Sequence, residues 1–127
     1  MAVVVGFIPT EVGFSALAAA REEAEMRGGP LIVVNVVRDG VTQDPRHATE
    51  QQLEIARDQV RQTPVRIEMR QEHTADDIAD VLLRVVEDER AELLVLGIRR
   101  HKDLARHLMG LTVQKLLLSA RSEVLVV

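Results

Sequence analysis

The sequence has no cysteine, tryptophan or tyrosine, and its only aromatic residues are Phe7 and Phe14. The lack of cysteine excludes a disulfide framework, a zinc site with thiolate ligands, an iron–sulfur cluster and a cysteine nucleophile. With so few aromatic side chains, the protein also lacks the stacking platform on which single-stranded nucleic acids bind. We therefore expect neither a disulfide-stabilised protein nor one with a nucleic-acid partner.

Long apolar runs are missing as well. Runs such as those at residues 2–5 and 93–96 fall far short of the roughly 18 apolar residues that indicate a membrane-spanning helix. The amino terminus passes into an apolar run without the basic region that opens a signal peptide. These features predict a cytoplasmic protein with no membrane partner. The length of 127 residues predicts one domain covering residues 1–127.

What the sequence does contain is a regular alternation of apolar runs and helical segments. The runs, at 3–8, 31–37, 65–69, 93–98 and 124–127, are rich in β-branched residues, and apolar residues recur at helical spacing between them. This order predicts an α/β fold of the Rossmann-like, doubly wound type, with an open parallel five-stranded sheet and helices on both faces. The third run alternates apolar and charged residues, which is typical of a strand at a sheet edge.

Three positions in the helical segments carry specific expectations. Met26 is expected on the apolar face of the first helix. Thr74 has the residue type and the position of an N-cap for the third helix. Leu117 is expected to be buried in the fourth helix, over residues 111–120.

One connection between a strand and a helix is both long and positively charged. Residues 99–107 hold four arginine or lysine side chains against one aspartate, a net charge of +3 in a chain whose total is −4. A basic loop on an acidic protein favours a small anionic ligand over a long polyanion. Gly110 then precedes a helix, whose first amides suit a phosphate. A solvated loop paired with neighbouring acids explains the same pattern, so both interpretations stay open here.

Other reactive residue types are present, but not in reactive patterns. The four histidines show no H-E-x-x-H or related spacing, so we predict no metal site. Asp76, Asp77 and Asp80 fall where a helix begins, and the helix dipole is a sufficient reason for them. No serine lies in a G-x-S-x-G elbow, and no G-x-x-x-x-G-K-[ST] phosphate loop is present. The sequence therefore predicts a protein that is not an enzyme.

The last third of the chain resembles a known signature. An apolar strand ends in Gly97, a basic loop and Gly110 follow, and the chain closes on Ser-Glu-Val-Leu-Val-Val. This order is similar to that of the universal stress protein family, whose nucleotide signature reads G-x2-G-x9-G-[ST]. Gly97 and Gly110 match its first and third glycines. Arg100 stands at the second glycine and Leu111 at the Ser or Thr, although Thr112 follows immediately.

The resemblance extends over the whole chain and implies a non-catalytic stress-response regulator. Its implied ligand is an adenine nucleotide, ATP or AMP, or another small anion, held without a metal between the first and fourth strands. The implied ligand-binding residues come from three strand ends and the start of the fourth helix: Ile8, Pro9, Thr10, Val36, Gly97, Arg99, Arg100, Gly110, Leu111 and Thr112. In this arrangement Val36 offers backbone contacts to the adenine ring, and Arg99 and Arg100 neutralise the phosphates.

A second function stays open, that of a dimerising interaction module which has lost ATP binding. The ATP-binding members of the family usually carry an aspartate after the first strand, where this chain has Ile8, and Arg100 and Leu111 also depart from the signature. Both hypotheses include a homodimer. The last four residues, Val124 to Val127, form an apolar strand that would be exposed at a sheet edge unless a second subunit covers it.

Overall fold

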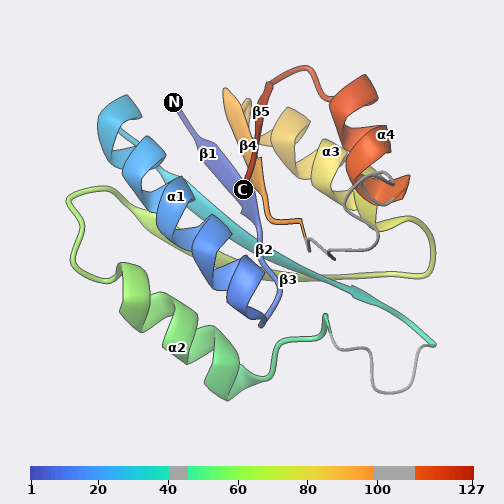
Figure 1. The fold of residues 1–127 in the computed structure, drawn as a ribbon, viewed down its shortest axis with the longest axis horizontal. Helices are drawn as coiled ribbons and strands as arrows, with labels where there is room; N and C mark the ends of the chain where they lie inside the picture. Colours follow the sequence, from blue (N-terminus) through green and yellow to red (C-terminus); the bar gives the residue numbers. More distant parts are fainter. Residues whose placement is uncertain (41–45, 99–110) are drawn as a thin grey trace, which may run out of the picture.

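The computed structural model describes residues 1–40, 46–98 and 111–127, and only the backbone of Leu111. Figure 1 shows a central sheet with helices on either side. The strands are β1 (Val3–Gly6), β2 (Leu31–Arg38), β3 (Ile67–Thr74), β4 (Leu93–Leu96) and β5 (Glu123–Val126). The helices are α1 (Glu11–Arg27), α2 (Glu50–Val60), α3 (Ile78–Asp88) and α4 (Leu111–Ser119).

All five strands run parallel, in the order β3-β2-β1-β4-β5. Val3 of β1 lies opposite Leu31 of β2 on one side and Leu93 of β4 on the other. The predicted parallel doubly wound sheet is thus confirmed, and so is the place of the third strand at an edge. The strand order reverses between β1 and β4, where the chain crosses from one half of the sheet to the other.

Each face of the sheet carries its own apolar layer. Helices α1 and α2 cover one face, and α3 and α4 cover the other, as Figure 1 shows. Successive residues of β1 alternate between the layers, with Val3 and Val5 on the α1 side and Val4 on the α3 side. Burial on both faces explains why β1, β2 and β4 are continuous aliphatic runs in the sequence.

The third strand differs from its prediction. It begins at Ile67 and continues through polar residues to Thr74. Each residue of β2 from Leu31 to Arg38 has a partner in β3, so the pairing with β2 extends the strand beyond its apolar residues. The prediction of Thr74 as an N-cap is therefore wrong. Asp77 caps α3 instead, accepting the Ala79 N–H at 2.9 Å.

Two side chains predicted to be buried are exposed. Met26 is 73% exposed because it lies two residues after the buried Ala24, which turns it about 200° around α1. Leu117 is 41% exposed because its neighbour Leu116 occupies the inward position of α4. Among the described residues, no helix is both long and apolar enough to cross a membrane.

Candidate functional site

A small cavity lies at the carboxyl ends of β1 and β4, where the strand order reverses. Open α/β sheets bind their ligands at this position. The cavity has a volume of about 160 Å³. The described residues that line it are mostly aliphatic, with one arginine and one threonine: Gly6, Phe7, Ile8, Val34, Val36, Arg46, Ile78, Leu82, Leu96, Gly97, Thr112, Val113 and Leu116. Such a lining suits a flat apolar group that carries polar substituents at its rim.

Four of the predicted ligand residues line this cavity. Ile8 follows β1, Val36 belongs to β2, and Gly97 follows β4. Thr112 belongs to the first turn of α4. These residues are far apart in the sequence, and they meet because parallel strands end at the same edge of the sheet.

Among the other predicted residues, those before α1 do not line the cavity. Pro9 and Thr10 belong to the connection between β1 and α1, where the Thr10 hydroxyl caps α1 by accepting the Gly13 N–H at 3.1 Å. Leu111 is the first residue of α4. Arg99, Arg100 and Gly110 lie outside the described residues, as does the whole basic segment 99–107, so their contribution stays a prediction.

Gly97 has a packing role that the sequence did not reveal. A Cβ atom at this position would lie 2.5 Å from Val12 Cγ1 and 2.8 Å from the Val12 carbonyl oxygen. The first turn of α1 therefore packs directly against the end of β4, with no space for a side chain. Gly13 makes a similar approach, since its Cβ would lie 1.8 Å from the Ile8 carbonyl oxygen. These glycines set the distance between α1 and the strand ends.

Sequence reasoning missed Asn35, which is completely buried behind the cavity. Its Nδ2 donates to the Phe7 carbonyl at 2.9 Å and to the Arg46 carbonyl at 2.6 Å. Its Oδ1 accepts the Ala48 N–H and the Gln71 Nε2, each at 3.0 Å. A single polar residue within an apolar strand was the available signal, because a buried amide is tolerated only where its hydrogen bonds are made.

Arg46, also missed, lines both the cavity and a larger outer groove. The groove has a volume of about 670 Å³ and lies between the end of β2, the start of α3 and the outer side of α4. Its lining is largely polar: Arg38, Arg46, Asp76, Asp77, Ile78, Thr112, Gln114, Lys115, Leu118 and Ser119. Because Arg46, Ile78 and Thr112 belong to both linings, the groove continues the cavity outward.

The groove contains a small network of charges. Lys115 Nζ lies 2.8 Å from Asp77 Oδ2 and 2.8 Å from Asp80 Oδ1, which joins α4 to the start of α3. The hydrogen bond from Lys115, followed by that from the Ala79 N–H, lowers the pKa of Asp77. The same two carboxylates, Asp77 first, raise the pKa of Lys115. Two of the three acids that the sequence placed at a helix start, Asp77 and Asp80, are thus paired with Lys115.

Two histidines lie near this edge of the sheet. The His47 and His73 rings are perpendicular, with centroids 6.4 Å apart, and His73 Nδ1 lies 3.3 Å from Asp39 Oδ1. Within residues 1–40, 46–98 and 111–127, no group of three or more His, Asp or Glu residues is placed to hold a metal ion.

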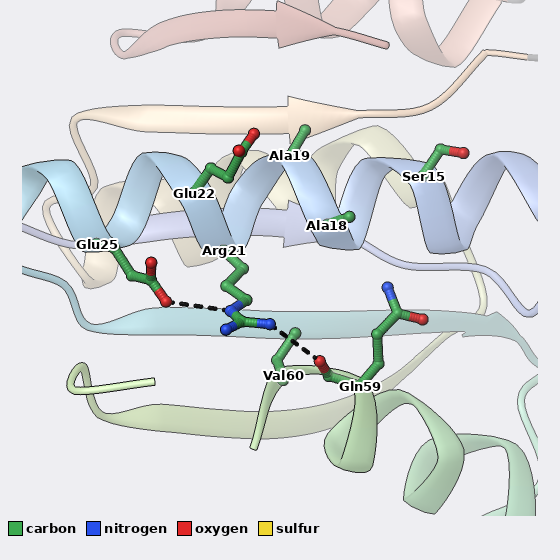
Figure 2. A pocket seen from close by; sticks show the side chains of 8 residues that line it. All are labelled: Ser15, Ala18, Ala19, Arg21, Glu22, Glu25, Gln59 and Val60. Carbon is green, nitrogen blue, oxygen red and sulfur yellow. Dashed lines mark hydrogen bonds and ion pairs between the residues drawn. The ribbon is translucent and has the colours of Figure 1, made fainter. Parts of the chain in front are cut away.

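A second hollow, between α1 and α2, has a volume of about 630 Å³. Figure 2 shows Arg21 reaching from α1 towards the end of α2, while Ser15 and Ala19 point away from α2. Arg21 is bonded to Glu25 Oε1 at 3.1 Å and to the Gln59 carbonyl at 3.4 Å. The polar groups of this hollow thus bond to one another and join α1 to α2. We therefore place the candidate site at the carboxyl edge of the sheet.

Comparison with known proteins shows which family the chain resembles. A model of the universal stress protein family matches residues 1–127. A universal stress protein from Mycolicibacterium smegmatis is 31% identical over 125 residues, which span 98% of this chain and 95% of that protein.

Solved structures show the same fold. A universal stress protein in complex with cAMP superposes with a TM-score of 0.79 at 24% identity, covering 100% of this chain and 95% of that one. A universal stress protein from Archaeoglobus fulgidus in complex with dAMP has a TM-score of 0.71 at 21% identity, covering 98% of this chain and 94% of that one. With the family match over the full length and a relative above 30% identity, the chain belongs to the universal stress protein family.

Proposed function

We propose that the protein is a non-catalytic stress-response regulator that binds an adenine mononucleotide at the carboxyl edge of the sheet, between β1 and β4. The observation that carries this proposal is the cavity at the reversal of strand order, which brings Val36, Gly97 and Thr112 together. The cAMP and dAMP complexes of two proteins with this fold support an AMP-type ligand. The proposed location is the cytoplasm, as the sequence predicts.

The size of the cavity defines the proposed pose. Its volume of about 160 Å³ is below the roughly 300–1,000 Å³ of common ligand pockets, so it holds the base but not the whole nucleotide. The aliphatic side chains of Val34 and Val36 contact the base. The sugar and phosphate lie outside, beside the first turn of α4, where the amides and the Thr112 hydroxyl donate to phosphate oxygens. Arg99 and Arg100 are expected to neutralise its charge.

Calorimetric titration tests the proposal. AMP, cAMP and ATP are titrated into the wild-type protein, with and without magnesium. The Thr112→Val variant should bind AMP roughly three- to tenfold more weakly, because one hydrogen bond to phosphate is lost. Ser15→Ala removes a hydroxyl from α1, outside the cavity lining, and should leave the affinity unchanged. Absence of heat with all three nucleotides would contradict the proposed function.

A second candidate, the dimerising interaction module, is favoured by two observations. Packing alone explains Gly97, so this part of the signature needs no ligand. Among the residues that the structure describes, the outer edge of β5 also has unpaired backbone groups. Glu123 donates to the Glu92 carbonyl just before β4 at 3.2 Å and Val127 to the Leu96 carbonyl at 2.8 Å, so the alternating residues Val124 and Val126 point their N–H groups away from β4. A second copy of the chain at this edge would pair them.

Substitution at this edge tests the homodimer. Val126→Pro removes an outward N–H without removing a bond to β4, so the variant should fold and sediment as a monomer at micromolar concentration while the wild type sediments as a dimer. Val126→Thr keeps the N–H and should remain a dimer. A monomeric wild type would exclude the dimer. Nucleotide titration then separates the two functions, because only the regulator binds AMP.

A further inference from the structure

Asn35 lies on the opposite face of β2 from the candidate cavity. Its neighbours Val34 and Val36 line the cavity on the α3 side, and because side chains alternate along a strand, Asn35 points towards α1 and α2. It is fully buried, and its four hydrogen bonds use the whole capacity of the amide donors and both acceptor positions. A completely satisfied buried amide rigidifies whatever it joins.

What Asn35 joins is the chain segment that returns from the end of β2. Residues 46–48 are held at three backbone atoms: the Arg46 carbonyl accepts from Asn35, the Ala48 N–H donates to Asn35, and the Ala48 carbonyl accepts from Gln71 Nε2 at 2.8 Å. Asn35 also binds the Phe7 carbonyl, at the end of β1. We call these contacts of Asn35 and Gln71 with residues 46–48 the amide clamp.

The clamp lies immediately beside the binding cavity. Arg46, the first clamped residue, lines both the cavity and the outer groove, and Phe7 lines the cavity as well. A long arginine side chain loses much conformational entropy when it binds a ligand, and a backbone held in place reduces the additional ordering that binding requires. Arginine is also well suited to a phosphate, which its planar guanidinium can bind through two hydrogen bonds.

We propose that Asn35 is a positioning residue for ligand binding: through the amide clamp it holds Arg46 at the rim of the cavity, where the guanidinium contacts the bound nucleotide. This inference rests on the proposed function, since it assigns a ligand contact to Arg46 within the same site. Asn35 itself touches no ligand, because its side chain lies behind the strand. Gln71, on the edge strand β3, completes the clamp from the other side.

A double-mutant cycle on AMP affinity tests the proposal. Arg46→Ala should weaken binding roughly ten- to a hundredfold, the loss expected of a charge-assisted contact. Asn35→Leu keeps the branched shape of the side chain and removes the clamp, and it should weaken binding roughly tenfold. In the Arg46→Ala background, Asn35→Leu should change the affinity less than about twofold, because its effect acts through Arg46. Equal weakening in both backgrounds would overturn the proposal.

Two further variants separate positioning from a general loss of structure. Gln71→Met removes the hydrogen bonds from Gln71 Nε2 to Asn35 and to the Ala48 carbonyl. Because Gln71 is only half-buried, this variant should fold even if Asn35→Leu does not, and it should also bind AMP more weakly than the wild type. Val33→Ala truncates a buried residue on the same face of β2, two positions before Asn35. It should lower thermal stability but leave the affinity unchanged. A Gln71→Met protein with wild-type affinity would contradict the role of the clamp.

Amide hydrogen exchange gives a readout that needs no ligand. The Ala48 N–H should exchange faster in Asn35→Leu and Gln71→Met, beyond any change at the amides of β1, whereas Val33→Ala should not single it out. Unchanged protection of Ala48 in Asn35→Leu overturns the clamp. If the wild type binds no nucleotide, the proposed function is refuted. The exchange rate of the Ala48 N–H then still tests whether Asn35 holds residues 46–48 in place.

Discussion

Replacement of Gly97 by alanine is the most direct test of how closely α1 packs against the end of β4. Carbon atoms in ordinary contact lie about 3.5–4.0 Å apart, whereas a Cβ at Gly97 would lie 2.5 Å from Val12 Cγ1. The Val12 side chain can turn away, because it is only half-buried. The Val12 carbonyl oxygen, at 2.8 Å, belongs to the helix backbone and moves only if α1 moves.

The expected loss follows from these two contacts. Overfilling a well-packed region costs about 1–3 kcal/mol, and replacing glycine by alanine recovers about 0.4–1 kcal/mol by restricting the unfolded chain. We therefore expect Gly97→Ala to lower the free energy of unfolding by about 1–2 kcal/mol. In urea, with a slope of about 1–3 kcal/mol per molar, the unfolding midpoint should fall by roughly 1 M.

A cycle with Val12→Ala assigns the loss to its source. In the Val12→Ala background the γ-methyl contact is gone, so Gly97→Ala should cost less there, and the cost that remains belongs to the carbonyl oxygen. A Gly97→Ala protein within 0.5 kcal/mol of the wild type, about the size of an ordinary surface substitution, would show that α1 does not pack this closely. The reasoning about the glycine would then be refuted.

Three other substitutions test separate parts of the fold. Asp77→Asn keeps an N-cap but loses the carboxylate. Because the pKa of Asp77 is lowered in the folded protein, the ionised carboxylate stabilises the fold above the unfolded pKa of about 3.9, and this stabilisation is lost as the pH falls through the folded pKa. The thermal midpoint of the variant should therefore change less with pH in this acid range than that of the wild type. Thr49→Ala removes the capping box with Gln52 and should cost about 0.5–2 kcal/mol in urea unfolding, whereas unchanged stability would contradict the cap. Leu116→Ala, at a fully buried position in the cavity lining, should cost about 2–5 kcal/mol, and a loss under 1 kcal/mol would mean that α4 is loosely packed.

Most of the fold was predictable because its central strands are simple in sequence. β1, β2 and β4 are buried on both faces, so their aliphatic runs stand out, and Gly28-Gly29-Pro30 ends the helical segment before β2. The exception is β3, where pairing with β2 continues along polar residues from Arg70 to Thr74. No local pattern records such pairing, since it depends on a strand far away in the sequence.

The site was predictable only where the chain carries a motif. Ile8, Val36, Gly97 and Thr112 were implied by the resemblance to the universal stress protein family, and the structure brings them to one cavity. Arg46 belongs to no motif and to none of the helices or strands, so the sequence did not indicate that it lines the cavity. Its place depends on hydrogen bonds to side chains of β2 and β3, which are set by tertiary structure alone.

The two functional candidates differ in which residues need a ligand to explain them. Gly97 and Gly13 are sufficiently explained by packing, since a Cβ at either position would collide with backbone atoms. A chain that had lost its ligand would therefore retain both. Arg46 and Thr112 are different: they are the polar residues among the described residues that line the cavity, at the point where it opens into the groove, and the proposed binding mode gives each of them a contact with the nucleotide. The case for a ligand depends on these two side chains, so their substitution distinguishes regulator from interaction module more sharply than any change at the signature glycines.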